Sequence, residues 1–360
     1  MSLSAASTYG EALGIMKTYI VGSVEKSSGK TGVIVGLKAA LGKPAGYMKP
    51  FGDRLRYLKK RLWDYDSALI TQMWDLKENP EDISIGFEHI KLQYKYDAVT
   101  IEEKLCEMAN RTGAGKDILF VEAGNHLHYG LSVNLDALTM ARALKAELVV
   151  VAGGPEGVVA DDLAALKKNT NLEGITLKGV IFNKIHDLED FKETHLPRLS
   201  ALGLPILGCI PNEPKLTHFT MGYLAEILFS KILAGEQGLS NVVEHIVIGA
   251  MSVGSALRQT SFNKHKKLVI TPGDRTDMIQ AALEGGTSGI ILTNNILPPA
   301  SVISRAEAEK TPLLLVSSDT YQTAKQVDSL EPLLTKDDHA KAELLERLVR
   351  EHVELLKFQS

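Results

Sequence analysis

Cysteines and long apolar runs are scarce in this chain of 360 residues, and each scarcity excludes a class of protein. Cys106 and Cys209 are the only cysteines, and no CxxC pair occurs. Two such cysteines provide neither a thiolate metal cluster nor a disulfide framework, which is typical of a reducing cytoplasm, where we expect the protein to reside. No apolar run reaches the ~18–20 residues that a membrane span needs, and we expect no signal peptide.

An excess of charge of either sign is also missing. The chain has 40 Lys and Arg residues against 44 Asp and Glu residues, which gives a net charge of −4. This balance lacks the basic surface that binds nucleic acid or an anionic membrane, so we expect neither as a partner. Hydrophobic residues make up 44% of the chain, as in globular proteins, and the length favours two domains.

The stretch from Thr18 to Thr31 is the most informative part of the sequence. The apolar run 19–21 predicts a buried strand, and small residues then lead into Gly29-Lys30-Thr31 and a helical pattern. This order is typical of a phosphate-binding loop, in which backbone N–H groups and the helix dipole attract an anion. Lys30 would contact the β- and γ-phosphates of a nucleotide, and the Thr31 hydroxyl would bind Mg²⁺.

The loop departs from the strict pattern at one place. The pattern has a glycine five residues before Gly29, where this chain has Val24, and Gly22 comes two residues too early. The prediction therefore depends on the position of the tripeptide between a strand and a helix. The residues that we expect to surround the nucleotide phosphates are Glu25, Lys26, Ser27, Ser28, Gly29, Lys30 and Thr31.

Apolar runs alternate with amphipathic segments over the first part of the chain. After the first strand, we expect strands at 45–52, 117–124, 147–152, 174–183 and 205–210. Continuous Val, Ile and Leu runs between helices predict an α/β fold, a P-loop NTPase-type parallel sheet with helices on both faces. We expect residues 64–110 to be mostly helical, with Thr100 as the N-cap of a helix.

A second, smaller α/β pattern follows, with strands expected at 243–249, 267–271, 288–293 and 312–316. It predicts a second domain of this class. We therefore divide the chain into a leader (1–17), a nucleotide-binding domain (18–215), a linker helix (216–240), a second domain (241–335) and a carboxyl-terminal helix (336–360).

Polar residues fall at the carboxyl ends of the predicted strands, where ligands bind in such sheets. Glu122 ends a buried strand and could hold Mg²⁺ directly or through water. Asp64 and Asp66 are two residues apart, so on an extended segment both side chains point the same way. One of them could be the second metal carboxylate, and we prefer Asp66, although a solvated acidic turn explains the pair equally well.

Three further residues complete the candidate site. Pro50 keeps Lys49 out of the helical region, which would aim its side chain along the sheet edge. There Lys49 could neutralise an anionic substrate or a transferring phosphate, so Lys30 and Lys49 are the candidate catalytic residues; a solvated lysine is the alternative. The amide of Asn183 could read a nucleotide base, and Pro211 could pack on that base.

These motifs, in this order, resemble dethiobiotin synthetase and the related cobyrinic acid amide synthases. They are Gly22 with Gly29-Lys30-Thr31, Met48-Lys49-Pro50, Asp66-Ser67-Ala68, Val121-Glu122-Ala123-Gly124, Asn183 and Leu207-Gly-Cys-Ile-Pro211. The resemblance implies ATP and Mg²⁺ at Lys30, Thr31, Asp66 and Glu122, and an anion-binding role for Lys49. Lys26-Ser27-Ser28 replaces the Thr-Glu-Val of the synthetase, and Asn125-His126 falls within its glycine-rich loop, so the resemblance does not imply dethiobiotin synthesis.

The second half resembles the DRTGG-type domain. Its name-giving motif appears as Asp274-Arg275-Thr276-Asp277-Met278, with the double glycine replaced, and 248–252 also fits that domain. The two halves together resemble the amino-terminal region of long bacterial phosphotransacetylases, of which stand-alone versions exist. With 360 residues, we expect no phosphotransacetylase catalytic domain here. The synthetase is a dimer, so the resemblance implies a homodimer or a higher homo-oligomer.

Two functions from different classes remain open. The first is a nucleotide-dependent regulatory or sensor protein, in which the second domain binds an unknown small-molecule ligand. The second is an ATP-dependent ligase, in which a carboxylate attacks the γ-phosphate and an amine captures the acyl phosphate. In the ligase, Lys30 and Lys49 would stabilise charge on the transferring phosphoryl group.

Overall fold

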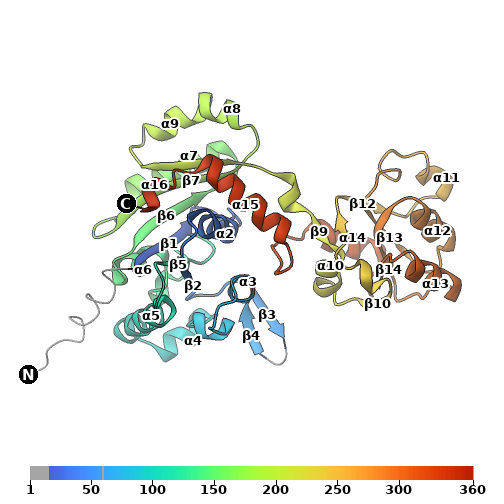
Figure 1. The fold of residues 1–360 in the computed structure, drawn as a ribbon, viewed down its shortest axis with the longest axis horizontal. Coiled ribbons are helices and arrows are strands. Elements are labelled where there is room, and N and C mark those ends of the chain that lie inside the picture. Colours follow the sequence, from blue (N-terminus) through green and yellow to red (C-terminus); the bar gives the residue numbers. More distant parts are fainter. Residues whose placement is uncertain (1–15, 59–60, 360) are drawn as a thin grey trace, which may run out of the picture. The chain divides into compact units, whose positions relative to one another are not determined.

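The structure is a computed structural model that describes residues 16–58 and 61–359. It divides into two compact units, and each is described by itself (Figure 1). Unit 1 runs to Glu213 and resumes at Lys336, whereas unit 2 spans Pro214–Thr335. In sequence, unit 2 is therefore an insertion into unit 1.

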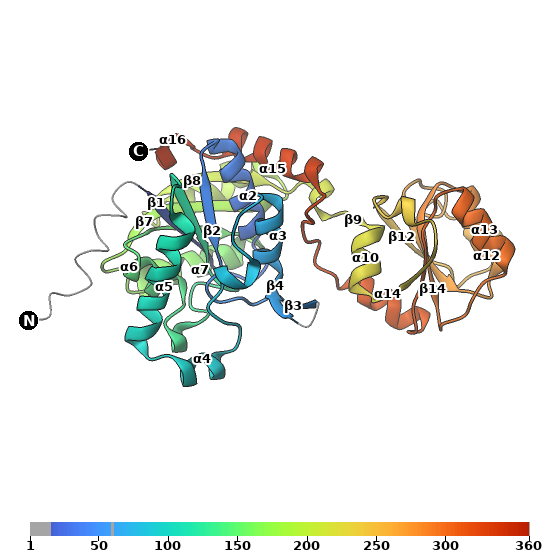
Figure 2. The ribbon, with the colours of Figure 1, turned by 60° about the horizontal axis from the view of Figure 1, so that its bottom comes forward.

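Unit 1 is built on a six-stranded sheet in the order β2-β5-β1-β6-β7-β8 (Figure 2). The strands are β1 (Lys17–Ser23), β2 (Ala45–Met48), β5 (Ile118–Glu122), β6 (Glu147–Ala152), β7 (Thr176–Ile185) and β8 (Ile206–Pro211). Every pairing is parallel, and the central strands are buried almost throughout. The predicted parallel sheet is confirmed, because apolar runs buried on both faces form central strands.

Helices cover both faces of this sheet. They are α2 (Lys30–Leu41), α5 (Ala98–Gly113), α6 (Ala137–Ala143), α7 (Glu156–Asn169), α8 (Leu188–Asp190), a π-helical stretch (Phe191–His195) and α9 (Leu196–Ser200). The strand order reverses at β1, since α2 leads toward one edge and α6 toward the other. Right-handed crossovers therefore place α2 and α6 on opposite faces.

The connection between β2 and β5 begins with a hairpin that the sequence did not predict, and the expected mostly helical segment 64–110 follows it. It contains a hairpin of β3 (Leu55–Leu58) and β4 (Arg61–Asp64), then α3 (Tyr65–Met73), a 3-10 turn (Pro80–Ile83) and α4 (His89–Lys95). The extended segment expected at Asp64 and Asp66 is wrong, because α3 begins at Tyr65. Helix α5 starts before the expected Thr100: Asp97 is its N-cap, and Thr100 is its partner in the capping box.

Unit 2 contains a five-stranded sheet in the order β10-β15-β14-β13-β12. Its strands are β10 (Lys231–Ala234), β12 (His245–Ile248), β13 (Lys267–Pro272), β14 (Thr287–Thr293) and β15 (Leu313–Leu315), and β9 (Phe219–Thr220) pairs separately with β11 (Val242–Val243). Its helices are α10 (Met221–Ile227), α11 (Val253–Ala256), α12 (Thr276–Glu284), α13 (Ala300–Ala308) and α14 (Thr320–Asp328). One apolar cluster joins the sheet to α11, α12 and α13, and another joins it to α10 and α14. The predicted second α/β unit is thus confirmed.

The segment 216–240, expected to be a linker helix, belongs to unit 2 instead. Helix α10 ends at Ile227, and the chain then forms β10, which pairs antiparallel with β15. Met221 and Leu224 of α10 are fully buried in the core. The segment therefore supplies an edge strand and part of the apolar core.

The carboxyl-terminal segment packs on the first unit. The single helix expected there is interrupted: α15 (His339–His352) is followed by a bridge from Val353 to Gly208 and by α16 (Leu356–Gln359). Helix α15 lies along α2, where a Cβ on Gly36 would be 2.7 Å from the Leu345 carbonyl oxygen. The absence of a side chain at Gly36 thus permits the close contact of the two helices.

No helix in the described ranges has both the length and the apolar character that crossing a membrane requires.

We predict that Gly36→Ala destabilises the protein by about 1–3 kcal/mol, because the added methyl group meets backbone that cannot move without separating α15 from α2. Gly157→Ala in α7 is the matched control, since a Cβ at Gly157 has no neighbour within 4 Å. We expect this control to be neutral or to stabilise by up to about 1 kcal/mol. Urea unfolding measures both; equal stabilities for the two variants would contradict the close contact.

Candidate functional site

The turn from β1 into α2 has the geometry of an anion cradle. Ser27 and Gly29 take left-handed backbone angles, with φ of 60° and 90°, and Gly29 is the N-cap of α2. Within the described residues, no side chain caps the amino end of α2. The ammonium of Lys30 is buried and donates to Ser23 Oγ at 3.0 Å, so it lies beneath the loop. Burial lowers the pKa of Lys30.

Two side chains from β7, which is separated from β1 by β6, hold the loop. Asn183 Nδ2 donates to the Ser28 carbonyl oxygen at 2.8 Å, and Lys184 Nζ donates to the Ser27 carbonyl oxygen at 2.8 Å. A Cβ at Gly29 would collide with the Asn183 amide. Asn183 therefore contacts the loop backbone, and glycine is required at position 29 for both its φ and this contact.

Glu122 at the end of β5 accepts hydrogen bonds from two hydroxyl groups. Thr31 Oγ1 donates to Glu122 Oε1 at 2.9 Å, and Tyr47 OH donates to Glu122 Oε2 at 3.0 Å. The register pairs Glu122 with Val21 of β1, so the carboxylate lies beside the start of the loop. Burial and the nearby Asp66 carboxylate raise the pKa of Glu122 from 4.5 to about 7.

Lys49 lies inside a cluster of carboxylates and is only 1% exposed. Its Nζ is 2.5 Å from Asp53 Oδ1 and 2.6 Å from Asp66 Oδ2. The Nζ is also 3.4 Å from Asp64 Oδ2 and 4.0 Å from Glu122 Oε1. Burial alone would lower the pKa of Lys49, but these carboxylates, Asp66 foremost, raise it well above its ordinary value.

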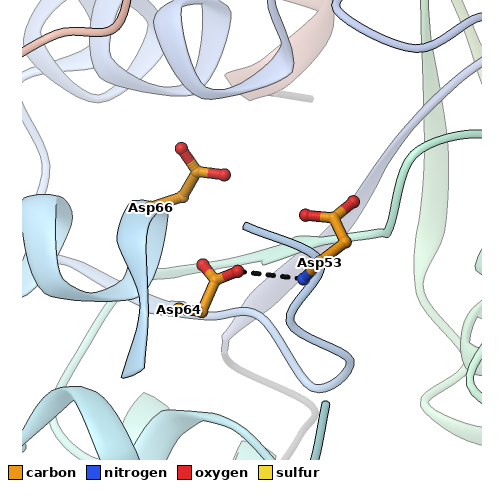
Figure 3. Close-up of side chains that lie close together, drawn as sticks. All are labelled: Asp53, Asp64 and Asp66. Carbon is orange, nitrogen blue, oxygen red and sulfur yellow. Dashed lines mark hydrogen bonds between the residues drawn. The ribbon is translucent and has the colours of Figure 1, made fainter. Parts of the chain in front are cut away.

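The structure separates the roles of Asp64 and Asp66 (Figure 3). Asp64 caps α3 by accepting from Ser67 N and also accepts from the backbone N–H groups of Asp53 and Arg54. Burial raises the pKa of Asp64. Asp66 accepts charged donors from Lys49 and Arg54, and these outweigh burial and lower its pKa. Asp64 therefore shapes the turn, whereas Asp66 is the carboxylate held by cations.

Most predicted site residues meet at one edge of the sheet. Thr31, Lys49, Asp66 and Glu122 form a connected set of hydrogen bonds and ion pairs. Lys30 contacts Ser23 at the end of β1. The exposed Glu25 and Lys26 lie on the rim of the loop. Pro211 ends β8 opposite Ile185 of β7, at the same edge.

The sequence analysis named Asp64 and Asp66 but missed Asp53 and Tyr47. Asp53, Asp64 and Asp66 are the group that could together hold a metal ion among the described residues, with ligand atoms within 4.8 Å of one another. Asp53 follows the Lys49-Pro50 turn by three residues, and this spacing was the available signal. Tyr47 stands two residues before Lys49, and on an extended segment such residues point to the same face. This spacing was the signal that Tyr47 lies on the same side as Lys49.

In unit 2, the DRTGG-type motif ties two loops together. Arg275 Nη2 donates to the Met251 carbonyl oxygen at 2.8 Å, and its Nε lies 3.3 Å from Asp277 Oδ1. Met251 follows β12 and Arg275 follows β13, two adjacent parallel strands. The motif thus connects loops at the carboxyl edge of the second sheet.

A parallel sheet whose first strand leads through Gly29-Lys30-Thr31 into a helix, beside a strand that ends in a carboxylate, defines a P-loop NTPase-type protein. A family model described as an AAA domain matches residues 17–220, more than half of the chain, and the chain belongs to this family. A second model, the DRTGG domain, matches residues 223–330. Both halves of the resemblance are confirmed.

The relatives include phosphate acetyltransferases. The chain is 25% identical over 365 residues to that of Pseudomonas putida, covering 94% of this chain and 51% of the relative. It is 26% identical over 366 residues to that of Nitrosomonas europaea, covering 94% and 50%. The chain thus spans about half the length of these curated relatives.

Among solved structures, the chain is similar to cobyrinic acid a,c-diamide synthase from Mycobacterium smegmatis with bound ATP analog and magnesium. The identity is 14%, the coverage is 55% of this chain and 88% of that chain, and the TM-score is 0.36.

We predict that Glu122→Gln becomes more stable relative to the wild type as the pH rises. The raised pKa means that the folded protein holds the Glu122 proton more tightly than the unfolded chain does. The resulting cost to stability is absent below about pH 4.5 and grows as the pH rises through about 7. Gln keeps an acceptor for Thr31 and removes this cost, so urea unfolding in chelator should show a relative gain of roughly 1–3 kcal/mol between pH 5 and 8.

Glu147→Gln controls for the loss of one carboxylate, because Glu147 forms a half-buried ion pair with Lys178 outside the cluster. A stability difference between Glu122→Gln and wild type that does not change from pH 5 to pH 8 would contradict the raised pKa.

Proposed function

We propose that this protein binds ATP with Mg²⁺ at the β1–α2 loop and acts as a nucleotide-dependent regulatory or sensor protein. The observation that carries the proposal is the joint position of Lys30, Thr31 and Glu122 at the carboxyl edge of the sheet. A buried ammonium under a glycine turn and a hydroxyl paired with a carboxylate are the groups that contact a triphosphate and its metal ion.

The residues present fit a magnesium ion. Thr31, Asp66 and Glu122 offer only oxygen ligands, which suits a hard divalent cation. Four carboxylates surround Lys49 in this cluster, so an added divalent charge would reduce their mutual repulsion. Mg²⁺ would supply charge neutralisation for the phosphates. Asp66 would exchange its contact with Lys49 for the ion or a bound water.

The proposal also gives each of the remaining predicted residues a role toward the nucleotide. Residues 25–31 would surround the phosphates. Asn183 would stabilise the loop through its contact with Ser28, and it lies with Pro211 at the edge where a base would extend. Lys30 would neutralise the γ-phosphate, which is the charge that the loop alone cannot balance.

A regulatory role is supported by the second unit. The DRTGG match is joined in one chain to the P-loop unit, and unit 2 is inserted between residues 213 and 336 of unit 1. We propose that unit 2 binds a small ligand, that the protein forms a homo-oligomer, and that it works in the cytoplasm. Phosphate acetyltransferase activity is not part of the proposal, since the aligned region is about half of those relatives.

The alternative is an ATP-dependent carboxylate–amine ligase. Lys30 and Lys49 lie at the same edge of the sheet, as charge stabilisation of a transferring phosphoryl group requires. In the ligase, Lys49 would contact the acyl group or the γ-phosphate.

We predict that Lys30→Ala lowers ATP affinity at least ~100-fold in calorimetry with Mg²⁺, because a buried charge-assisted contact to the phosphates is lost. Lys38→Ala is the matched control: Lys38 lies two turns further along α2, 5.7 Å from the Trp74 ring. It should bind ATP as the wild type does. Unchanged affinity in Lys30→Ala would remove the phosphate site.

Turnover separates the two functions. We expect purified protein with ATP and Mg²⁺ to release ADP slowly or not at all, with or without carboxylic acids and amine donors. Stimulation of ADP release by one acid–amine pair would replace the sensor with the ligase.

A further inference from the structure

The pairing of Lys49 distinguishes this site from one that accepts an anionic co-substrate. The Lys49 ammonium is almost fully buried, and Asp53 and Asp66 contact it at 2.5 and 2.6 Å. An ammonium has three N–H donors, and two of them are directed to these carboxylates. Asp64 Oδ2 lies 3.4 Å from the same ammonium. An incoming carboxylate would therefore have to displace one of these oxygens.

The carboxylates around Lys49 differ in their other hydrogen-bond and ion-pair partners. Asp64 binds three backbone N–H groups, Asp66 also contacts Arg54, and Glu122 accepts from Thr31 and Tyr47. The side chain of Asp53 instead makes its ion pair with Lys49, four residues earlier, while its backbone N–H donates to Asp64. The side chain of Asp53 can thus be changed without removing the backbone contact that shapes the turn.

We propose that Asp53 is a specificity-determining residue that acts as a built-in counter-anion for Lys49 and excludes small carboxylates from the position beside the γ-phosphate. The inference rests on the proposed function for the location of the phosphates. When a metal ion takes Asp66, Asp53 still neutralises Lys49. The site therefore accepts a nucleotide but not the acyl co-substrate that a ligase needs.

Electrostatics supports this role. Asp53, Asp64, Asp66 and Glu122 carry up to four negative charges, against the ammonium groups of Lys30 and Lys49 and the guanidinium of Arg54. A further carboxylate would enter a buried region in which the negative charges already equal or exceed the positive ones, and repulsion there is weakly screened. Loss of the Asp53 charge shifts this balance by one unit toward binding an anion.

The test is a calorimetric titration of nucleotide-free protein with succinate as the probe. We expect the wild type to bind succinate weakly or not at all, and Asp53→Asn to bind it at least tenfold more tightly. Asp162→Asn is the charge-matched control, because Asp162 lies near Glu25 of the loop and its Oδ2 has no hydrogen-bond partner among the described residues. This control should bind succinate as the wild type does.

The double variant Asp53→Asn/Lys49→Gln shows whether the gain in succinate affinity depends on Lys49. The proposal requires the gain to disappear in this variant, and a gain that persists would assign it to another cation such as Lys30. Equal succinate affinity in wild type and Asp53→Asn would also overturn the proposal. Thermal melts confirm folding, and Asp53→Ser, which is smaller, replaces Asp53→Asn if the latter does not fold.

These outcomes are separable from those of the proposed function. The succinate titration needs no nucleotide, whereas ATP binding is measured on wild type and Lys30→Ala. A tenfold gain in Asp53→Asn together with no ATP binding would refute the nucleotide site alone, and ATP binding without the gain would refute the role of Asp53 alone.

Discussion

The burial of one ammonium among carboxylates organises the functional edge of unit 1. Lys49 comes from the end of β2, Asp64 from the end of β4 and Glu122 from the end of β5. A buried charge without a partner costs several kcal/mol, so these elements must end at the same place for the fold to be stable. The β3–β4 hairpin and the first turn of α3 are therefore held beside the phosphate-binding loop.

The loop itself depends on packing from two sides. On one side, Asn183 and Lys184 of β7 donate to its carbonyl oxygens. On the other, α2 is covered by α15, which the chain forms only after completing unit 2. Tyr19 of β1 also donates to the Phe358 carbonyl oxygen at 2.9 Å. The segment that follows the inserted unit is thus part of the framework of the P-loop helix.

The sequence predicted those features whose cause is local. Except for β10, the strands of the two main sheets follow from continuous apolar runs, and the phosphate-binding loop follows from a tripeptide between a strand and a helix. Strand β10 was missed because the run Lys231–Ala234 continues the apolar spacing of α10, and only its pairing with β15 makes it a strand. The contact of Lys49 with Asp66 was missed because its partners are brought together by the hairpin, which no pattern around Lys49 specifies.

The same charges bear on the choice between a sensor and a ligase. Phosphoryl transfer requires a cation that faces the transferring group when the negative charge spreads over its oxygens. Lys30 lies under the loop, but the Lys49 ammonium is already bound by Asp53 and Asp66. When a metal ion takes Asp66, Lys49 remains paired with Asp53, and this pairing opposes the use of Lys49 on the transferring group. This pairing of Lys49 with Asp53 is the physical basis of our proposal that the site binds a nucleotide rather than catalysing a reaction on it.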